Sequence, residues 1–141
     1  MMHFVLDNSV TTRWLLMSEK AADQRYSEKI LNSLADNQAF VPNLWHLEVV
    51  NLLINAEKRK EIVSGDIERF ISQLDMLPIH VDSLTANQAF NRTLGLAIAY
   101  KLSSYDAAYL ELAVREGLAL ATLDKHLASA ANKVGVAIFL R

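Results

Sequence analysis

The amino-acid sequence predicts an α/β domain with a mainly parallel sheet that is covered by helices on both faces. Short apolar runs alternate along the chain with longer segments of helical periodicity, which is the pattern of repeated strand–helix units. Apolar runs of this kind suit strands that are buried on both faces. At 141 residues, the chain is expected to form one domain, residues 1–141, that can bury a single core.

Five segments are expected to form the strands of this sheet. Each is a short apolar run that is bounded by polar residues, proline or glycine. The segments are His3–Leu6, Ala39–Val41, Pro78–Val81, Leu118–Ala121 and Val136–Phe139.

The helices between these strands are predicted from capping residues and from apolar spacing. The expected ranges are 12–17 and 21–35 after the first strand, 44–60 and 64–74 after the second, and a helix that ends near 101 after the third. A further helix begins after Ser103, and another follows Asp124.

Composition narrows the classes of protein to be considered. The net charge is −2 and the pI is about 6.1, so no overall basic field would attract nucleic acid. The absence of cysteine excludes disulfides and thiolate metal sites. No apolar run is long enough for a membrane helix, and the first ten residues do not resemble a signal peptide, so a cytoplasmic protein is expected.

Four acidic residues share one expected location. Asp7 and Asp124 follow predicted strands, and Asp106 lies in the first turn of a helix. Glu48 interrupts the apolar side of the helix that follows the second strand. All four could reach the crevice at the carboxyl edge of the sheet, where open α/β sheets bind ligands. Carboxylates that share a pocket need protons or cations, and oxygen ligands without cysteine suit Mg²⁺ or Mn²⁺.

The same residues also have a purely structural interpretation. Asp7 could form a turn, and Asp124 could cap the helix that follows it. Ser103 and Asp106 have the spacing of a capping box. Glu48 fits this interpretation least well, because buried glutamate without a partner is rare.

Other enzyme classes lack their motifs. The sequence contains neither GxGxxG nor GxxxxGK[ST], and it has no GxSxG elbow. A receiver domain would have an acidic pair after the first strand, and a haloacid-dehalogenase-like phosphatase would have aspartate in place of Ser9.

Four motifs in order resemble those of the PIN-domain ribonucleases, in particular the VapC-like toxins of toxin–antitoxin pairs. They are VLDNSV, VPNLWHLEVVNLL, LSSYDAAYLELA and LATLDKHL, and together they span nearly the whole chain. The resemblance implies a three-layer α/β/α sandwich with a five-stranded parallel sheet in the order 3-2-1-4-5. It also implies RNA cleavage that depends on Mg²⁺ or Mn²⁺, a homodimer, and a small antitoxin protein as partner.

The resemblance assigns roles to the acidic residues. Asp7 and Asp106 would be the principal metal ligands, Glu48 would complete the set, and Asp124 matches a more variable fourth acid. Cleavage would then use a metal-activated water to attack the RNA phosphodiester.

Further residues are assigned to supporting roles. Ser9 and Thr122 are candidates to orient the carboxylates, and Asn51 matches a recurrent asparagine that we interpret as structural. Basic residues could contact RNA, and the alternative interpretation for most of them is solvated surface. The candidates are Arg13, Lys20, Arg25, Lys58, Arg59 and Lys125. Two alternatives stay open at this point: a PIN-like module that binds a protein without catalysis, and a nuclease without an antitoxin.

Overall fold

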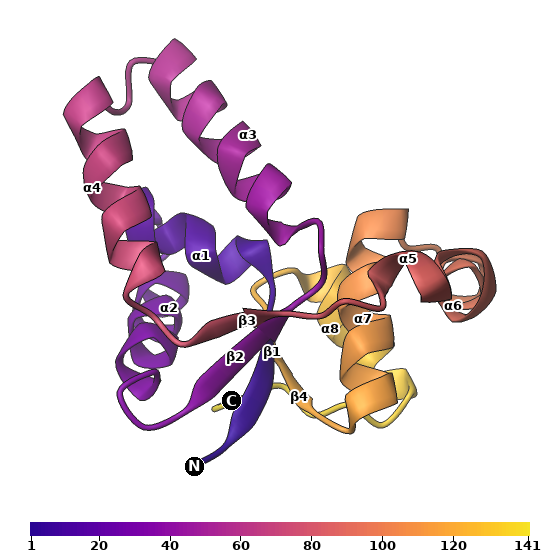
Figure 1. The fold of residues 1–141 in the computed structure, drawn as a ribbon. Coiled ribbons are helices and arrows are strands. Elements are labelled where there is room, and N and C mark those ends of the chain that lie inside the picture. Colours follow the sequence, from indigo (N-terminus) through magenta and orange to yellow (C-terminus); the bar gives the residue numbers. More distant parts are fainter.

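A computed structural model, which describes residues 1–141, contains a four-stranded parallel sheet in the order β3-β2-β1-β4 (Figure 1). The strands are β1 (His3–Leu6), β2 (Gln38–Val41), β3 (Ile79–Val81) and β4 (Ala119–Ala121). Because all neighbouring strands are parallel, their carboxyl ends meet at one edge. The predicted α/β class with a parallel sheet is therefore confirmed.

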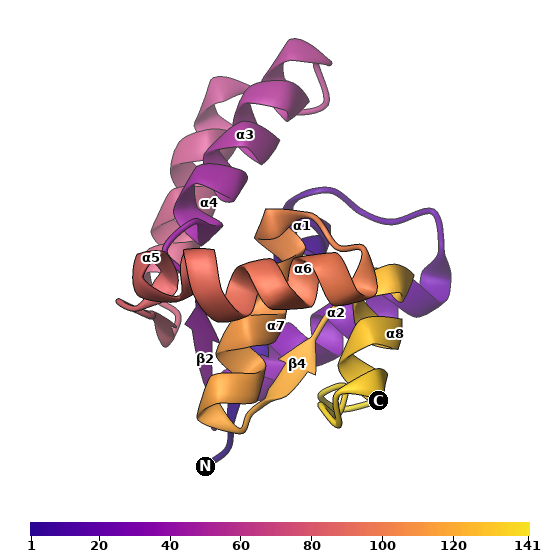
Figure 2. The same ribbon diagram turned by 90° about the vertical axis from the view of Figure 1, so that its right-hand side faces the viewer.

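Helices cover both faces of the sheet. In Figure 1, α1 and α2 lie on one side and α7 and α8 on the other, and Figure 2 shows α6 and α7 in front of the sheet. α3 and α4 form a hairpin that projects beyond the sheet (Figure 1). The helices before β3 are α1 (Asn8–Leu15), α2 (Ala21–Ser33), α3 (Trp45–Lys58) and α4 (Ser64–Asp75). Those after β3 are α5 (Thr85–Gln88), the π-turn η1 (Ala89–Thr93), α6 (Leu94–Tyr100), α7 (Ser104–Glu116) and α8 (Lys125–Lys133).

The prediction of five strands was wrong. The segment Val136–Phe139 makes only one bridge to the sheet, in which Ile138 pairs in parallel with Leu120 of β4. The backbone turns away directly afterwards, since Leu140 has a φ of 59°. The sheet order 3-2-1-4 matches the first four places of the expected order, and the bridge lies where the fifth strand was expected.

Two helix predictions also differ from the structure. The first helix begins at Asn8 rather than Thr12, because Asp7 already occupies the N-cap position. The expected continuous helix up to residue 101 is divided into α5, η1 and α6 by the π-turn, and it ends at Lys101 with a left-handed φ of 56°.

The core is formed by the strands and by the inner faces of the helices. Phe4, Val5 and Leu6 of β1 are completely buried, as are Leu120 of β4 and Tyr109 of α7. Burial of an aliphatic or phenyl side chain of this size contributes roughly 1.5–3 kcal/mol. The central strand β1 and helix α7 are therefore the most firmly packed elements, and both carry acidic candidate residues at their ends.

A buried ionic cluster attaches α7 to the chain just beyond β3. Arg115 donates to Glu111 at 2.8 and 3.0 Å and to Asp82 at 3.1 and 2.7 Å. These contacts raise the pKa of the guanidinium further above its usual range, chiefly through the hydrogen bonds to Glu111 and Asp82. Both acids are thereby neutralised at some distance from the candidate site.

The helices are all too short or too polar to cross a membrane.

Candidate functional site: an acidic crevice at the carboxyl edge of the sheet

Asp7 lies at the junction of β1 and α1, where its backbone N–H donates to the carbonyl of Ala121 in β4 at 3.0 Å. Its side chain is only 5 % exposed and does not cap α1. Instead, its Oδ2 accepts hydrogen bonds from the hydroxyls of Ser9 at 2.6 Å and Thr122 at 2.7 Å. Two hydroxyls, one from α1 and one from the end of β4, therefore hold the carboxylate in one orientation.

Ser9 and Thr122 belong to a small hydroxyl network that also fixes the β4–α8 loop. The two hydroxyls are 3.3 Å apart. The N–H of Leu123 donates to Ser9 at 2.9 Å, and the N–H of Asp124 donates to Thr122 at 3.0 Å. The hydroxyl network therefore sets the relative positions of Asp7 and Asp124.

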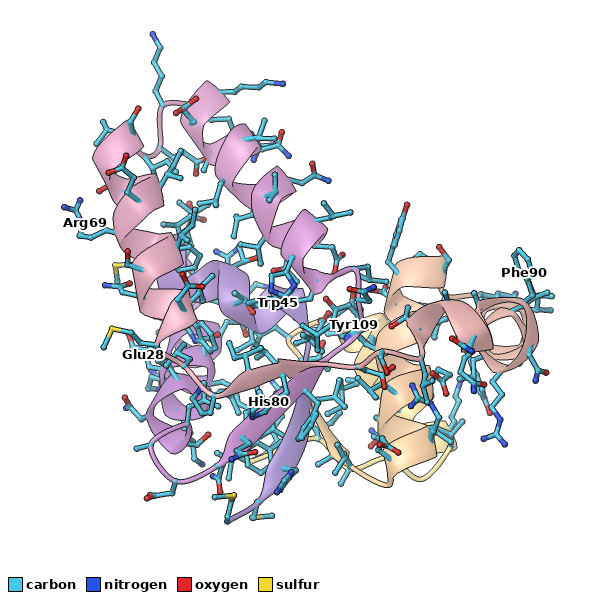
Figure 3. All side chains as sticks on the ribbon, in the orientation of Figure 1. Glu28, Trp45, Arg69, His80, Phe90 and Tyr109 are labelled. Atoms are coloured by element: carbon cyan, nitrogen blue, oxygen red, sulfur yellow. The ribbon has the colours of Figure 1, made fainter.

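Glu48 lies in the first turn of α3 and is half-buried. Its Oε1 accepts a hydrogen bond of 2.5 Å from the hydroxyl of Tyr109, a completely buried side chain of α7 (Figure 3). A second buried contact holds this end of α3 to α1, where the indole N–H of Trp45 donates to the hydroxyl of Thr11 at 3.2 Å. The start of α3 is thus attached to the domain from two directions.

Asp106 and Asp124 complete the crevice from the other side. Asp106 lies in the first turn of α7, where Ser103 caps its backbone N–H at 3.1 Å, and the Ser103 hydroxyl has only a minor lowering effect on the pKa of its carboxyl. Asp124 does cap α8, since its Oδ1 accepts from the N–H of Leu127 at 2.9 Å. Of the structural interpretations, capping thus accounts for Asp124 but leaves the carboxylates of Asp7 and Asp106 unexplained.

Electrostatics shows that the four carboxylates share one environment. Burial raises the pKa of Asp7 to about 6 against the opposing hydrogen bonds of Ser9 and Thr122, and the charges of Glu48 and Asp124 add to the increase. Burial likewise raises the pKa of Asp106 to about 6, with contributions from the charges of Asp7 and Asp124.

The pKa of Glu48 is also raised, first by burial and then by the charge of Asp106, while the bond from Tyr109 lowers it. Strongly shifted carboxylates in a crevice are a mark of functional sites. Only His126, through its effect on the pKa of Asp106, supplies a nearby positive influence.

The crevice lacks a cation of its own. None of the four acids forms an ion pair; the ion pairs of the structure join Arg59 to Glu61, Arg69 to Asp66, and Arg115 to Glu111 and Asp82. The Oδ1 of Asp7 accepts no hydrogen bond, and it is still accessible to solvent.

The spacing of these side chains limits how an ion could be held. No three of the acidic and histidine side chains come close enough together to hold a metal ion by themselves. Mg²⁺ is commonly held by one or two carboxylates and keeps several waters. The donor set, which is all oxygen and carries excess negative charge, therefore fits a hydrated divalent ion better than a closed metal cage.

Other predicted site residues lie outside the crevice. Asn51 is exposed and makes no side-chain hydrogen bond, so it does not support Glu48. Lys58 and Arg59 lie at the end of α3 that points away from the sheet (Figure 1). Arg25 is exposed on α2, and Lys125 begins α8 next to Asp124.

Arg13 and Lys20 are the two basic candidates that line a pocket next to the crevice.

Sequence reasoning missed Tyr109 as the partner of Glu48, because a tyrosine among the apolar residues of α7 has the pattern of an ordinary core residue.

The chain is similar to one family model and to several solved structures. The family model described as "PIN domain" matches residues 4–133. Among solved structures, the crystal structure of PAE2754 from Pyrobaculum aerophilum matches with a TM-score of 0.63 and 21 % sequence identity, over 92 % of this chain and 86 % of that one. No curated protein sequence matches.

The chain therefore belongs to the PIN domain family. PIN domains have a nuclease-type fold and are generally hydrolases that cleave nucleic acids, typically with divalent metals. At 21 % identity, the likeness to PAE2754 shows the shared fold alone.

Proposed function

We propose that this protein is an endoribonuclease that depends on Mg²⁺ or Mn²⁺ and serves as the toxin of a VapC-like toxin–antitoxin pair. The observation that carries the proposal is the acidic crevice itself. Asp7, Glu48, Asp106 and Asp124 meet at the carboxyl edge of the sheet and form no ion pair, and the pKa values of Asp7, Glu48 and Asp106 are raised by burial and by neighbouring carboxylates of the group. Such a cluster is unfavourable for the folded protein unless a cation occupies it.

In this proposal, Asp7 and Asp106 hold the ion. Asp7 is suited to this role because Ser9 and Thr122 hold one of its oxygens while the other is left without a partner. Asp106 is suited because its carboxylate forms no ion pair and the Ser103 hydroxyl has only a minor effect on its pKa. When bound, a divalent ion lowers the pKa of a water and offsets the charge of the scissile phosphate.

Glu48 and Asp124 each have one carboxylate oxygen that is hydrogen-bonded within the protein. One oxygen of Glu48 is bonded to Tyr109 and one of Asp124 to the N–H of Leu127. The second oxygen of each remains available to orient the attacking water or a water bound to the ion.

The decisive test is RNA cleavage with matched variants. Wild type should cleave single-stranded RNA with added Mn²⁺ and lose the activity in EDTA. Asp7→Asn should be inactive, whereas Asp36→Asn, which removes an exposed carboxylate after α2, should be fully active. Cleavage that persists in EDTA or in Asp7→Asn would refute the assigned site. Sequencing of RNA ends after induction in cells would then identify the target.

The proposed partners are a second copy of the chain and a small antitoxin. Exposed apolar side chains after β3 support self-association: Phe90, which projects from the surface in Figure 3, is 95 % exposed, and Ile98 is 71 % exposed. Light scattering at high concentration should give the mass of a dimer, and a monomer would refute this part. A small, cotranscribed neighbour should relieve toxicity on induction, and its absence would leave a nuclease without an antitoxin.

A further inference from the structure

A polar pocket of about 440 Å³ lies beside the acidic crevice. It is formed by α1, the α1–α2 loop, the start of α2 and the β4–α8 loop. Its lining residues are Ser9, Thr12, Arg13, Ser18, Glu19, Lys20, Asp23, Leu123 and Asp124. Ser9, which binds Asp7, and Asp124 belong to both the pocket and the crevice. Whatever fills the pocket is therefore adjacent to a molecule bound at the acids.

The size and chemistry of the pocket indicate its occupant. A volume of this size is within the range of small-molecule sites and leaves room for about one nucleotide. Leu123 is the only apolar residue of the lining, and the lining has no aromatic ring on which a base could stack. The pocket is thus suited to the sugar and phosphate of a nucleotide rather than to its base.

Arg13 has the properties of a phosphate ligand. Its side chain is half-buried and forms no ion pair, and its one hydrogen bond is a long contact of 3.5 Å to the carbonyl of Met17. Lys20, on the other rim, is also without an acidic partner. A guanidinium and an ammonium that face one pocket can together bind the two non-bridging oxygens of one phosphodiester by charge-assisted hydrogen bonds.

The α1–α2 loop that forms the pocket is held in place before any ligand binds. The side chain of Gln24 accepts from the N–H of Ser18 at 2.8 Å and donates to the carbonyl of Arg13 at 3.3 Å. The hydroxyl of Ser18 in turn accepts from the N–H of Lys20 at 3.1 Å. These three hydrogen bonds fix the backbone at Arg13 and the backbone at Lys20 relative to each other.

Asp23 has the chemistry needed to distinguish ribose from deoxyribose. It is half-buried in the first turn of α2 and makes no side-chain hydrogen bond or ion pair. An ionised carboxylate can only accept hydrogen bonds, and a 2′-hydroxyl can donate one. Because Glu19 and Asp124 also line the pocket, general attraction of anions is weak there, and binding requires these specific contacts.

We propose that the pocket is a ribonucleotide subsite that flanks the scissile phosphate. In it, Arg13 and Lys20 bind the neighbouring phosphate and Asp23 accepts a hydrogen bond from the ribose. The inference rests on the proposed ribonuclease function, whose site it extends along the RNA strand.

The experiment measures binding separately from cleavage. All variants carry Asp7→Asn and are kept in EDTA, and the probe is a short fluorescent polyuridine strand whose anisotropy is followed over a range of salt concentrations. Arg13→Gln/Lys20→Gln should bind roughly tenfold more weakly at low salt, since it loses charge-assisted bonds. Its plot of log affinity against log salt should be shallower by about 0.7, the value of one phosphate on a single strand.

The matched control is Arg92→Gln/Lys133→Gln, which removes the same charge from two exposed residues outside the pocket. This control should bind as its parent does. Equal weakening in both double variants, or an unchanged salt slope in the pocket variant, overturns the phosphate assignment.

A second comparison tests the sugar. Asp23→Ala should lose most of the preference for polyuridine over the matching polydeoxyuridine strand, and an unchanged preference overturns the role of Asp23. The cleavage assay of wild type distinguishes failure of the subsite from failure of the proposed ribonuclease function. RNA cleavage together with unaltered binding by the pocket variant removes the subsite alone, whereas lack of metal-dependent cleavage removes the proposed function.

Discussion

Replacement of Asp7 by asparagine should stabilise the metal-free protein at neutral pH. Burial raises the pKa of this carboxyl from 3.8 to about 6 in the folded state. At pH 7, the charge therefore costs the folded state about 3 kcal/mol relative to the unfolded chain. Asparagine keeps the shape, and its carbonyl oxygen can still accept from Ser9 and Thr122. Since neutral hydrogen bonds are weaker, we expect a net gain of about 1–3 kcal/mol, which raises the Tm by several degrees.

The pH dependence of this gain follows from the sign of the shift. Below pH 3.8 the carboxyl is protonated in both states, so wild type and variant should be equally stable. Between pH 3.8 and about 6 the unfolded chain has lost a proton that the folded protein retains, and the stability of wild type falls relative to the variant. Above about pH 6 the difference should be constant.

Urea unfolding in EDTA at a series of pH values measures this difference directly. Asp36→Asn, at an exposed position, is the matched control and should follow wild type within about 0.5 kcal/mol at every pH. Addition of Mn²⁺ should stabilise wild type more than Asp7→Asn, because a ligand stabilises only the state that binds it. A variant that is less stable than wild type at pH 7, or a gain that persists unchanged at low pH, would refute the reasoning.

Two further substitutions test contacts that the structure shows. Tyr109→Phe removes the 2.5 Å hydrogen bond to Glu48 and should lower RNA cleavage and Mn²⁺ affinity roughly tenfold, at a cost of about 1 kcal/mol in stability; wild-type activity and affinity would contradict the positioning role. Arg115→Gln leaves the buried carboxylate of Glu111 and the half-buried carboxylate of Asp82 without their cation and should cost about 3 kcal/mol in urea unfolding. Arg69→Gln, which breaks the exposed pair with Asp66, should leave the stability almost unchanged, and a similar loss in both variants would show that burial is not the cause.

The elements that sequence predicted correctly are those with purely local signals. The apolar run of His3–Leu6 and the polar residue after it define β1 and the position of Asp7 without reference to the rest of the chain. Ser103 was recognised as the cap of α7 for the same reason, and its hydroxyl does accept the N–H of Asp106. Local capping and periodicity thus locate the strand ends and helix starts from which the acidic residues project.

The features that sequence did not predict depend on distant pairs. Tyr109 is 61 positions from Glu48, and Arg115 is 33 positions from Asp82. Nothing in the spacing of either residue indicates its partner. The prediction of a fifth strand was wrong for the opposite reason. Val136–Phe139 has the local composition of a strand, but the turn at Leu140 ends its pairing after one bridge.

That single bridge determines how the sheet ends. The N–H and carbonyl of Leu120 are paired with Ala137 and Phe139, each at 2.9 Å, so the outer side of β4 is covered without a full strand. The covering segment is held by side chains: the ring of Phe139 stacks on that of Phe4 with centroids 4.3 Å apart, and its carbonyl accepts from the hydroxyl of Tyr26 at 2.8 Å. An uncovered strand is a template on which another chain can add by backbone pairing. The aromatic side chains of Phe4, Tyr26 and Phe139, which hold the covering segment in place, thus also protect this edge of the sheet against pairing with another chain.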